Sequence, residues 1–222
     1  MNSQHIAEKG FTLLELLVVV AILSILAAVA IIVINPVETL REARDSQRIS
    51  DLSTIKTAIA IFITSATSTP RLDNNSGNTT CENGSGTDTL YYSYPSDSPG
   101  AQITDVLLDN STYTTSSQVA AANLGLVGGT GWIKVNLSGL NAGSPISNFP
   151  VDPSNTISNA AAVAATDLVY RYACDATDVT FEVNANLESQ TYDDKEGTDG
   201  GNNSSLYEVG TKLTILGTGT DF

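Results

Sequence analysis

The hydrophobic pattern of the first third of the chain begins with one long apolar run. Residues 11–34 contain three polar side chains, those of Thr12, Glu15 and Ser24. As an α-helix this run would be roughly 36 Å long at about 1.5 Å per residue, enough to cross a hydrocarbon core of about 30 Å. The run therefore predicts a membrane-spanning helix over residues 11–35 that carries one unexplained carboxylate.

The pattern becomes amphipathic after the pair Asn35-Pro36. Proline has no N–H and disfavours helix at the residue before it, so we expect a kink or a melted turn here. Beyond it, apolar residues at helical spacing predict an amphipathic helix over residues 36–63. The apolar stripe consists of Val37, Leu40, Ala43, Ile49, Leu52, Ile55, Ile59 and Phe62. We expect a solvated face formed by the charged residues between them, which are Glu38, Arg41, Glu42, Arg44, Asp45, Arg48 and Asp51.

Residues 64–222 predict a globular head, in which a loop-rich region with many turn signals comes before a sheet. A short strand is expected around Tyr91, Tyr92 and Tyr94, and longer strands are expected at Trp132–Leu137, Leu168–Cys174, Val179–Ala185 and Tyr207–Leu216. Asp175–Asp178 is interpreted as a tight turn. The predicted fold class is α+β, with a long N-terminal α-helix and a C-terminal antiparallel β-sheet that packs on the second half of that helix.

Charge excludes one broad class of function. The chain has 24 acidic and 10 basic side chains and a formal net charge of −14. A general nucleic-acid surface needs a basic stripe, so this balance argues against one. An acidic, hydrophilic head suits a solvated exterior.

Two cysteines, Cys81 and Cys174, are present. An even count in an exported domain predicts a disulfide, and the alternative is two unrelated thiols. The loop would close over 93 residues, for which the chain-entropy estimate is on the order of 4–5 kcal/mol.

Two general interpretations of the apolar run leave features unexplained. A cleaved secretory signal would use Lys9 and the small residues Ala28-Val29-Ala30, but a carboxylate at position 15 falls inside its apolar region and the run continues past the cut. An ordinary transmembrane anchor also leaves Glu15 without a reason. A carboxylate in lipid costs a few kcal/mol, so it usually has a partner and a function.

A third interpretation comes from a resemblance. The stretch Gly10-Phe11-Thr12-Leu13-Leu14-Glu15, followed by an unbroken apolar helix, resembles the prepilin cleavage motif of type IV pilins and pseudopilins. The resemblance implies a leader over residues 1–10, cut after Gly10 by the prepilin peptidase on the cytoplasmic side of the membrane. The same enzyme would then methylate the new N-terminal Phe11. Lys9 would stay on the cytoplasmic side, as the positive-inside tendency expects.

Under this resemblance Glu15 acquires a role in assembly. The Phe11 amine exposed by cleavage can carry a positive charge, and the carboxylate of Glu15 could pair with that amine in a neighbouring subunit. Pairing offsets the free-energy cost of a carboxylate in lipid, so the subunit would be more stable in a fibre than alone.

The resemblance also implies partners, location and function. The chain would be a single-pass precursor in the cytoplasmic membrane. An assembly platform with its ATPase would then polymerise it with other pilin subunits into an extracellular pilus for adhesion, motility or DNA uptake. One alternative is a pseudopilin in a periplasmic pseudopilus of a type II secretion system. A second is a membrane-anchored binding domain that never polymerises.

Candidate chemistry elsewhere in the sequence is sparse. We find no catalytic motif and expect no enzyme, since the single histidine, His5, lies in the predicted leader. One oxygen-rich, glycine-rich loop suits Ca²⁺, and its candidate ligands are Asp193, Asp194, Asp199 and Asn202. The alternative for this loop is a solvated turn. No other cofactor is expected.

Overall fold

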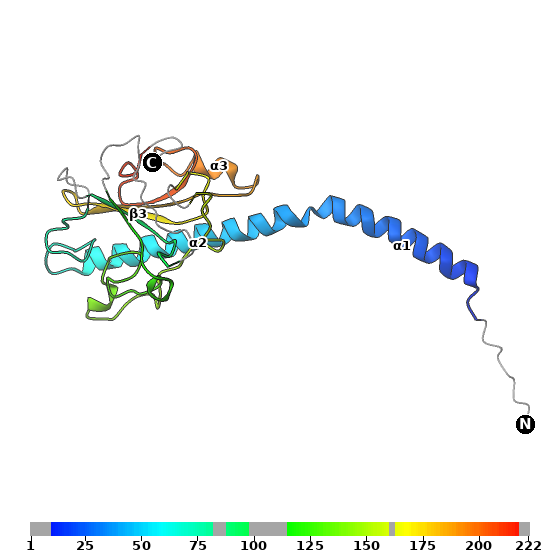
Figure 1. Cartoon of the computed structure of the whole chain (residues 1–222), viewed down its shortest axis with the longest axis horizontal. Coiled ribbons are helices and arrows are strands. Elements are labelled where there is room, and N and C mark those ends of the chain that lie inside the picture. The colour runs from blue at the N-terminus through cyan, green and yellow to red at the C-terminus, as the bar shows by residue number, and fades with distance from the viewer. Residues whose placement is uncertain (1–9, 82–87, 98–114, 160–162, 218–222) are drawn as a thin grey trace, which may run out of the picture. The chain divides into compact units, whose positions relative to one another are not determined.

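The computed structural model describes residues 10–81, 88–97, 115–159 and 163–217 (Figure 1). In these residues it has the predicted α+β fold class, a long N-terminal helical stretch and a C-terminal sheet. The elements in chain order are α1 (Leu13–Ile34), α2 (Pro36–Ser65), β1 (Thr89–Tyr92), β2 (Thr115–Ser117), the 3₁₀ turns η1 (Ala121–Asn123) and η2 (Leu137–Gly139), β3 (Arg171–Asp175), β4 (Thr180–Ala185), α3 (Asp193–Glu196) and β5 (Tyr207–Gly210). The predicted leader lies, except for Gly10, outside the described residues.

The expected interruption at Asn35-Pro36 is confirmed. Helix α1 ends at Ile34, and Asn35 caps it in the left-handed conformation with φ 44°. Asparagine is one of the few residues that tolerate this conformation. Pro36 then opens α2, where its missing N–H costs nothing because the first helical residues have no intrahelical acceptor. Contacts divide the chain into two units, residues 1–40 and residues 41–222, and we call the second unit the head.

The sheet of the head has the order β2-β1-β3-β4-β5. The four neighbours β1, β3, β4 and β5 are antiparallel, as predicted. The edge strand β2 was not predicted, and it pairs with β1 in parallel. The turn expected between Asp175 and Asp178 joins β3 to β4, and the side chain of Asp175 accepts hydrogen bonds from the backbone of Thr177 and Asp178.

Both faces of the sheet are covered. One face packs on Leu52, Ile55 and Ile59 of α2, and Figure 1 shows the sheet beside this part of the helix. The opposite face holds a second apolar cluster formed by Leu90, Tyr92, Val163, Ala165, Val169, Ala173, Leu206, Ile215 and Leu216. The strands are therefore buried on both sides, which is unusual for an antiparallel sheet that would otherwise turn one face to water.

The strand predicted at Trp132–Leu137 is wrong. This segment is irregular, and its contact with the rest of the chain includes one isolated bridge between Gly128 and Asn136. Trp132, Ile133 and Val135 are all fully buried, so the segment packs into the core from several sides instead of alternating between two faces. The indole N–H of Trp132 donates to the carbonyl of Pro150 at 2.9 Å.

The strand predicted at Tyr207–Leu216 is too long, because β5 ends at Gly210. Beyond it, the N–H groups of Ile215 and Leu216 donate to a carboxylate oxygen of Glu182, at 2.9 and 3.1 Å. A side chain therefore satisfies backbone groups that a longer strand would have used in the sheet. This turns the segment over the face of the sheet opposite α2.

The expected solvated face of α2 is wrong for two of its residues. Asp45 and Arg48 are fully buried, whereas the apolar Val37 and Leu40 are exposed. Arg48 donates to Asp45 at 2.8 Å, to Asp152 at 2.7 Å and to Glu188 at 3.1 Å. The backbone N–H groups of Glu188 and Ser189 also donate to Asp45. Burial lowers the pKa of Arg48, but these carboxylates outweigh burial and raise it above its ordinary value.

The predicted disulfide between Cys81 and Cys174 is present. Both cysteines are fully buried among the residues that pack between α2 and the sheet. The bond joins the segment that follows α2 to strand β3, across a sequence separation of 93 residues.

Candidate processing and assembly site

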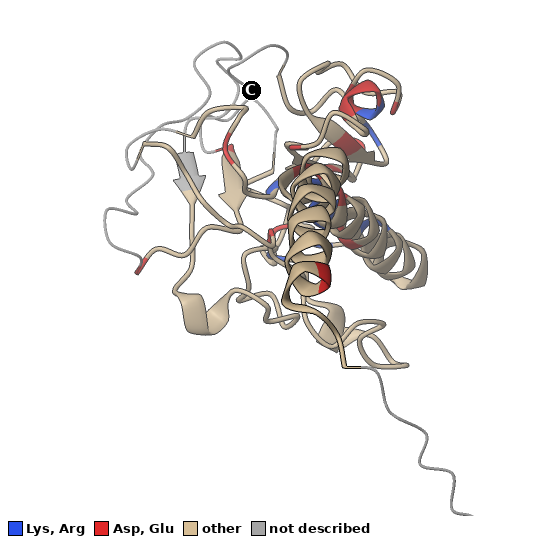
Figure 2. Ribbon diagram, turned by 90° about the vertical axis from the view of Figure 1, so that its right-hand side faces the viewer, with Lys and Arg blue, Asp and Glu red and all other residues tan. Residues whose placement is uncertain are grey.

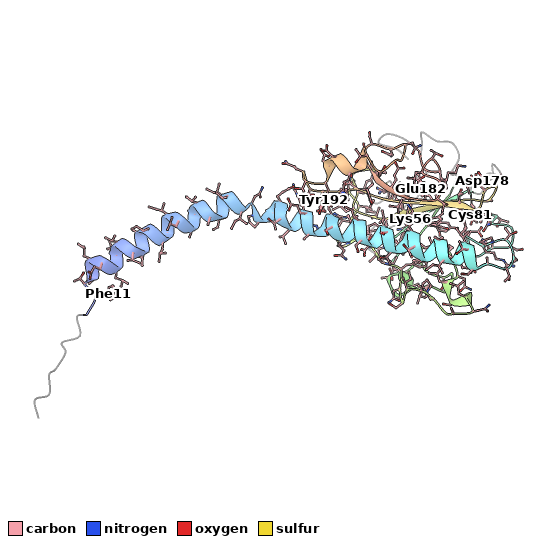
Figure 3. All side chains as sticks on the ribbon, turned by 180° about the vertical axis from the view of Figure 1, so that it is seen from behind. Phe11, Lys56, Cys81, Asp178, Glu182 and Tyr192 are labelled. Atoms are coloured by element: carbon pink, nitrogen blue, oxygen red, sulfur yellow. A yellow bond between two sulfur atoms is a disulfide. The ribbon has the colours of Figure 1, made fainter. Side chains whose placement is uncertain are left out.

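The residues predicted for processing lie at the exposed start of α1. Phe11 is 87% exposed, and its position in front of the helix is labelled in Figure 3. Gly10 has open space around it, since a Cβ atom built there would meet no heavy atom within 4 Å. An enzyme can therefore reach the Gly10–Phe11 bond without unfolding the described part of the chain.

Glu15 is held by Thr12 in a capping box. The Oε2 atom of Glu15 accepts from the backbone N–H of Thr12 at 2.9 Å and from its hydroxyl at 2.8 Å. In return, the N–H of Glu15 donates to the Thr12 hydroxyl at 3.2 Å. This reciprocal arrangement satisfies donors at the helix start that have no intrahelical acceptor. The other oxygen, Oε1, accepts no hydrogen bond within the described part of the chain.

Sequence reasoning missed the role of Thr12. The signal was present, because a threonine followed three residues later by a glutamate, in front of an apolar run, is the signature of a capping box. The sequence expectation for Glu15 concerns a charge that pairs with a distant amine and does not include this local contact.

The rest of α1 is apolar and uncovered. It has no buried residue, and its large side chains from Leu13 to Ile34 are between 46% and 83% exposed. The hydroxyl of Ser24 donates to the carbonyl of Val20, four residues earlier, at 2.6 Å. The Ser24 hydroxyl and Oε2 of Glu15 are thus satisfied within the helix, as a lipid environment requires, and Oε1 of Glu15 is the polar side-chain atom that is not. Among the described residues, one helical stretch, Leu13–Ser65, is long and apolar enough to cross a membrane.

The four residues predicted to bind Ca²⁺ have different surroundings. Asp193 and Asp194 are exposed in the short acidic helix α3 (Figure 2). Asp199 accepts from the backbone N–H groups of Gly201 and Glu208, and the side-chain amide of Asn202 donates to the carbonyl of Leu216. Within the described ranges, no group of three or more His, Cys, Asp or Glu side chains could hold a metal ion. The loop calcium site stays a prediction.

Residues 7–31 match the family described as the prokaryotic N-terminal methylation motif. This motif is the prepilin-type signal of type IV pilins and pseudopilins, so the resemblance noted in the sequence is confirmed for this segment. No curated protein and no solved structure matches the chain. The motif supports a type IV pilin-like or pseudopilin protein and implies processing by the prepilin peptidase. Together with the apolar helix it fits a membrane-anchored precursor.

Proposed function

We propose that the chain is a structural subunit of a type IV pilus-like surface filament. The prepilin peptidase cuts after Gly10 and methylates Phe11, and the subunit then polymerises through α1. The observation that carries this proposal is that α1 lies largely within a methylation motif, matched over residues 7–31, and buries none of its residues. A helix that is apolar all round needs lipid before assembly and copies of itself afterwards.

The contact between Thr12 and Glu15 supports a two-stage account of the carboxylate. In the membrane, the hydrogen bonds from Thr12 satisfy Oε2 and lower the cost of holding Glu15 in lipid. In the filament, Oε1 of the same carboxylate accepts the charged amine of Phe11 in the neighbouring subunit. Charge-assisted hydrogen bonds are about twice as strong as neutral ones, so this contact selects the axial step between subunits.

The test compares two polar residues of the same apolar run. Glu15→Gln keeps the shape and the capping hydrogen bonds but removes the charge, whereas Ser24→Ala removes a hydroxyl that is satisfied within its own helix. We expect filament yield, measured by shearing cells and weighing the pelleted fibres, to fall about tenfold or more for Glu15→Gln, because about 1.4 kcal/mol per contact corresponds to a factor of ten. Ser24→Ala should give normal yield. Full assembly of the Glu15→Gln variant would refute the pairing.

The same fractions distinguish the alternatives. Mass spectrometry of sheared filaments should find an abundant peptide that begins at methylated Phe11. If the processed chain is found in membranes and not in the sheared fraction, a pseudopilin of a type II secretion system is favoured. A processed chain found as a detergent monomer, with no filament under any condition, favours a membrane-anchored binding domain. An uncut N-terminus would refute the assignment.

A further inference from the structure

A cavity of about 390 Å³ lies at the β2 edge of the sheet. Its wall includes Thr89 and Tyr91 of β1 and Ser117 of β2. Thr89 and Tyr91 are two residues apart, and Tyr91 is the register partner of Ser117, so the three side chains lie on one face of the sheet. The loop formed by residues 73–80 and the irregular segment 129–134 contribute the other lining residues.

Two loops of the wall meet in a close contact. Asn74 and Gly129 both adopt the left-handed conformation, with φ 63° and φ 83°. A Cβ atom at Gly129 would lie 2.6 Å from the side chain of Asn74, so this approach requires glycine. The wall is therefore fixed by contacts within the chain, and it does not need a ligand to form.

The positive charge of the wall comes from Lys134, the one cation among the described residues that line the cavity. The side chain of Lys134 is half-buried, and its ammonium group lies over the ring of Tyr91, 5.9 Å from the ring centre. Within the described ranges this ammonium group makes no ion pair and no hydrogen bond. Burial lowers the pKa of Lys134, and no carboxylate opposes that shift.

The one carboxylate among the described lining residues is already used. Asp73 is 3% exposed, and its two oxygen atoms accept four hydrogen bonds from Asn75 and Thr80. The hydroxyl of Thr80 donates to Asp73 at 2.7 Å, so the hydroxyl of Tyr91, also 2.7 Å away, donates to Thr80. Asp73 therefore holds the loop of residues 73–80 together and does not pair with Lys134.

The acidic character of the chain makes this unpaired ammonium group informative. The chain has 24 acidic and 10 basic side chains, and Arg44, Arg48 and Lys212 of the head each contact a carboxylate. A half-buried charge without a partner lowers stability, and groups that do so are commonly those that a binding site needs. The position of Lys134 on the wall of a cavity therefore indicates a missing anion.

We propose that this cavity binds a hydroxylated carboxylate, such as one uronic acid unit of an otherwise neutral saccharide. The carboxylate would accept a charge-assisted hydrogen bond from Lys134. The sugar hydroxyls would exchange hydrogen bonds with the side chains of Asn74, Asn75 and Ser117, which can all donate and accept. One cation matches one negative charge, whereas a nucleic acid needs several cations and is repelled by a net charge of −14.

The test measures the binding of glucuronate to the full chain in detergent micelles at pH 7, by ligand-observed NMR. We expect a Kd on the order of 1 mM, as is reasonable for a monosaccharide held by a few polar contacts. Glucose, which lacks the carboxylate, should bind at least tenfold more weakly. Inorganic phosphate at the same concentration should not displace glucuronate. No filament is needed for this measurement, so its failure is distinguishable from failure of the proposed function.

Lys134→Gln and Lys56→Gln form a matched pair. Lys56 is an exposed lysine of α2 and is labelled in Figure 3. Lys134→Gln should bind glucuronate as weakly as glucose, because the charge-assisted hydrogen bond is lost. Lys56→Gln should bind as the wild type does. The Tm of Lys134→Gln should be no lower than that of the wild type, because the substitution removes a half-buried charge that has no partner.

Lys134→Arg gives a further readout if Lys134→Gln does not fold. It keeps the positive charge, so the preference for glucuronate over glucose should be retained. Four results would overturn the proposal: a wild-type chain without that preference, displacement of glucuronate by an equal concentration of phosphate, loss of the preference in Lys56→Gln, or loss of it in Lys134→Arg. A Lys134→Gln chain with a lower Tm and unchanged glucuronate binding would also overturn it, because Lys134 would then have a structural role.

Discussion

Helix α1 and the head bury their side chains in opposite ways. Helix α1 has an almost purely apolar sequence and buries nothing, whereas the described part of the head buries 17 polar or charged residues beside its apolar ones. Most of these buried polar groups have hydrogen-bond or ion-pair partners within the chain. Helix α1 satisfies the Ser24 hydroxyl and Oε2 of Glu15 locally, and it leaves Oε1 of Glu15 and its apolar surface to lipid or to other subunits. The comparison predicts that substitutions in the head change its stability, while substitutions in α1 change insertion and assembly.

The largest expected change in the stability of the head comes from removing the disulfide. Replacing both cysteines, Cys81→Ser with Cys174→Ser, releases a loop of 93 residues in the unfolded chain. We expect the free energy of unfolding of the head to fall by about 4–5 kcal/mol. Urea unfolding, followed through the fluorescence of Trp132, measures this change, because Trp132 is the single tryptophan and is fully buried in the head.

The control is the wild-type chain with its disulfide reduced, which should unfold at the same urea concentration as the double variant. Membrane insertion of both should be normal, because α1 contains no cysteine. If the double variant were as stable as the oxidised wild type, the segment between Cys81 and Cys174 would be held in place without the disulfide.

The second prediction concerns the buried charges through which residues of α2 contact the other segments of the head. Arg48→Met leaves the buried carboxylates of Asp45 and Asp152 without their cation. Breaking a buried pair by removing one partner typically costs about 3–5 kcal/mol, and we expect a loss of that size in urea unfolding. Arg41→Met, at an exposed position of the same helix, should change stability by less than about 0.5 kcal/mol. Equal effects of the two substitutions would contradict the assigned burial.

These charges also show where sequence reasoning stops. The spacing of charged and apolar residues in α2 identifies a helix. The predicted C-terminal end, residue 63, lies within two residues of the observed end, Ser65. The spacing could not show that Asp45 and Arg48 are buried, because their partners Asp152 and Glu188 are more than 100 residues away in the sequence. Local periodicity carries no information about such contacts, so a solvated face was the natural expectation.

The sheet illustrates the same limit. Alternating residues located β3 and β4 well, and the cysteine count led to the disulfide. The apolar segment around Trp132 has the composition of a strand, but composition does not distinguish a strand from irregular chain packed into a core. The length of β5 depended on Glu182, whose carboxylate takes the backbone N–H groups of Ile215 and Leu216. The alternating pattern of β4 predicts that Glu182 faces solvent. Glu182 is buried because the segment with Ile215 and Leu216 covers it, and the pattern does not reveal that contact.

The N-terminal site was the most predictable part, since a short contiguous motif defines it. Gly10, Phe11 and Glu15 were identified from sequence, and their roles in processing and assembly remain part of the proposed function. The contact from Thr12 was recoverable from the same six residues. The prediction of the calcium loop rests on composition alone, and composition does not fix which way the oxygen atoms of its four residues point.

The third prediction compares one residue type in the two regions. Ile55→Ala removes a fully buried side chain between α2 and the sheet, and we expect it to lower the stability of the head by about 2–4 kcal/mol. Ile25→Ala removes the same atoms from α1, where the side chain is 66% exposed, and should leave the unfolding of the head unchanged. Trp132 fluorescence in urea measures both. If Ile25→Ala destabilised the head, α1 would contribute to its core and the comparison would fail.

The smallest expected effect is a dependence of the stability of the head on pH. Burial raises the pKa of Glu196 to about 7, and the nearby carboxylates of Asp193, Asp45 and Asp199 add to the rise, although the backbone N–H of Leu187 donates to Glu196 and opposes it. The unfolded chain therefore loses this proton near pH 4.5, while the folded chain keeps it until about pH 7. The folded state binds more protons across this window, so the stability of the head should fall as pH rises from 4.5 to 7 and be level above it. Because the group is partly screened by solvent, we expect a loss on the order of 1–2 kcal/mol. Glu196→Gln, which can still accept from Leu187, should remove this part of the slope, and an unchanged slope would assign the pH dependence to other groups.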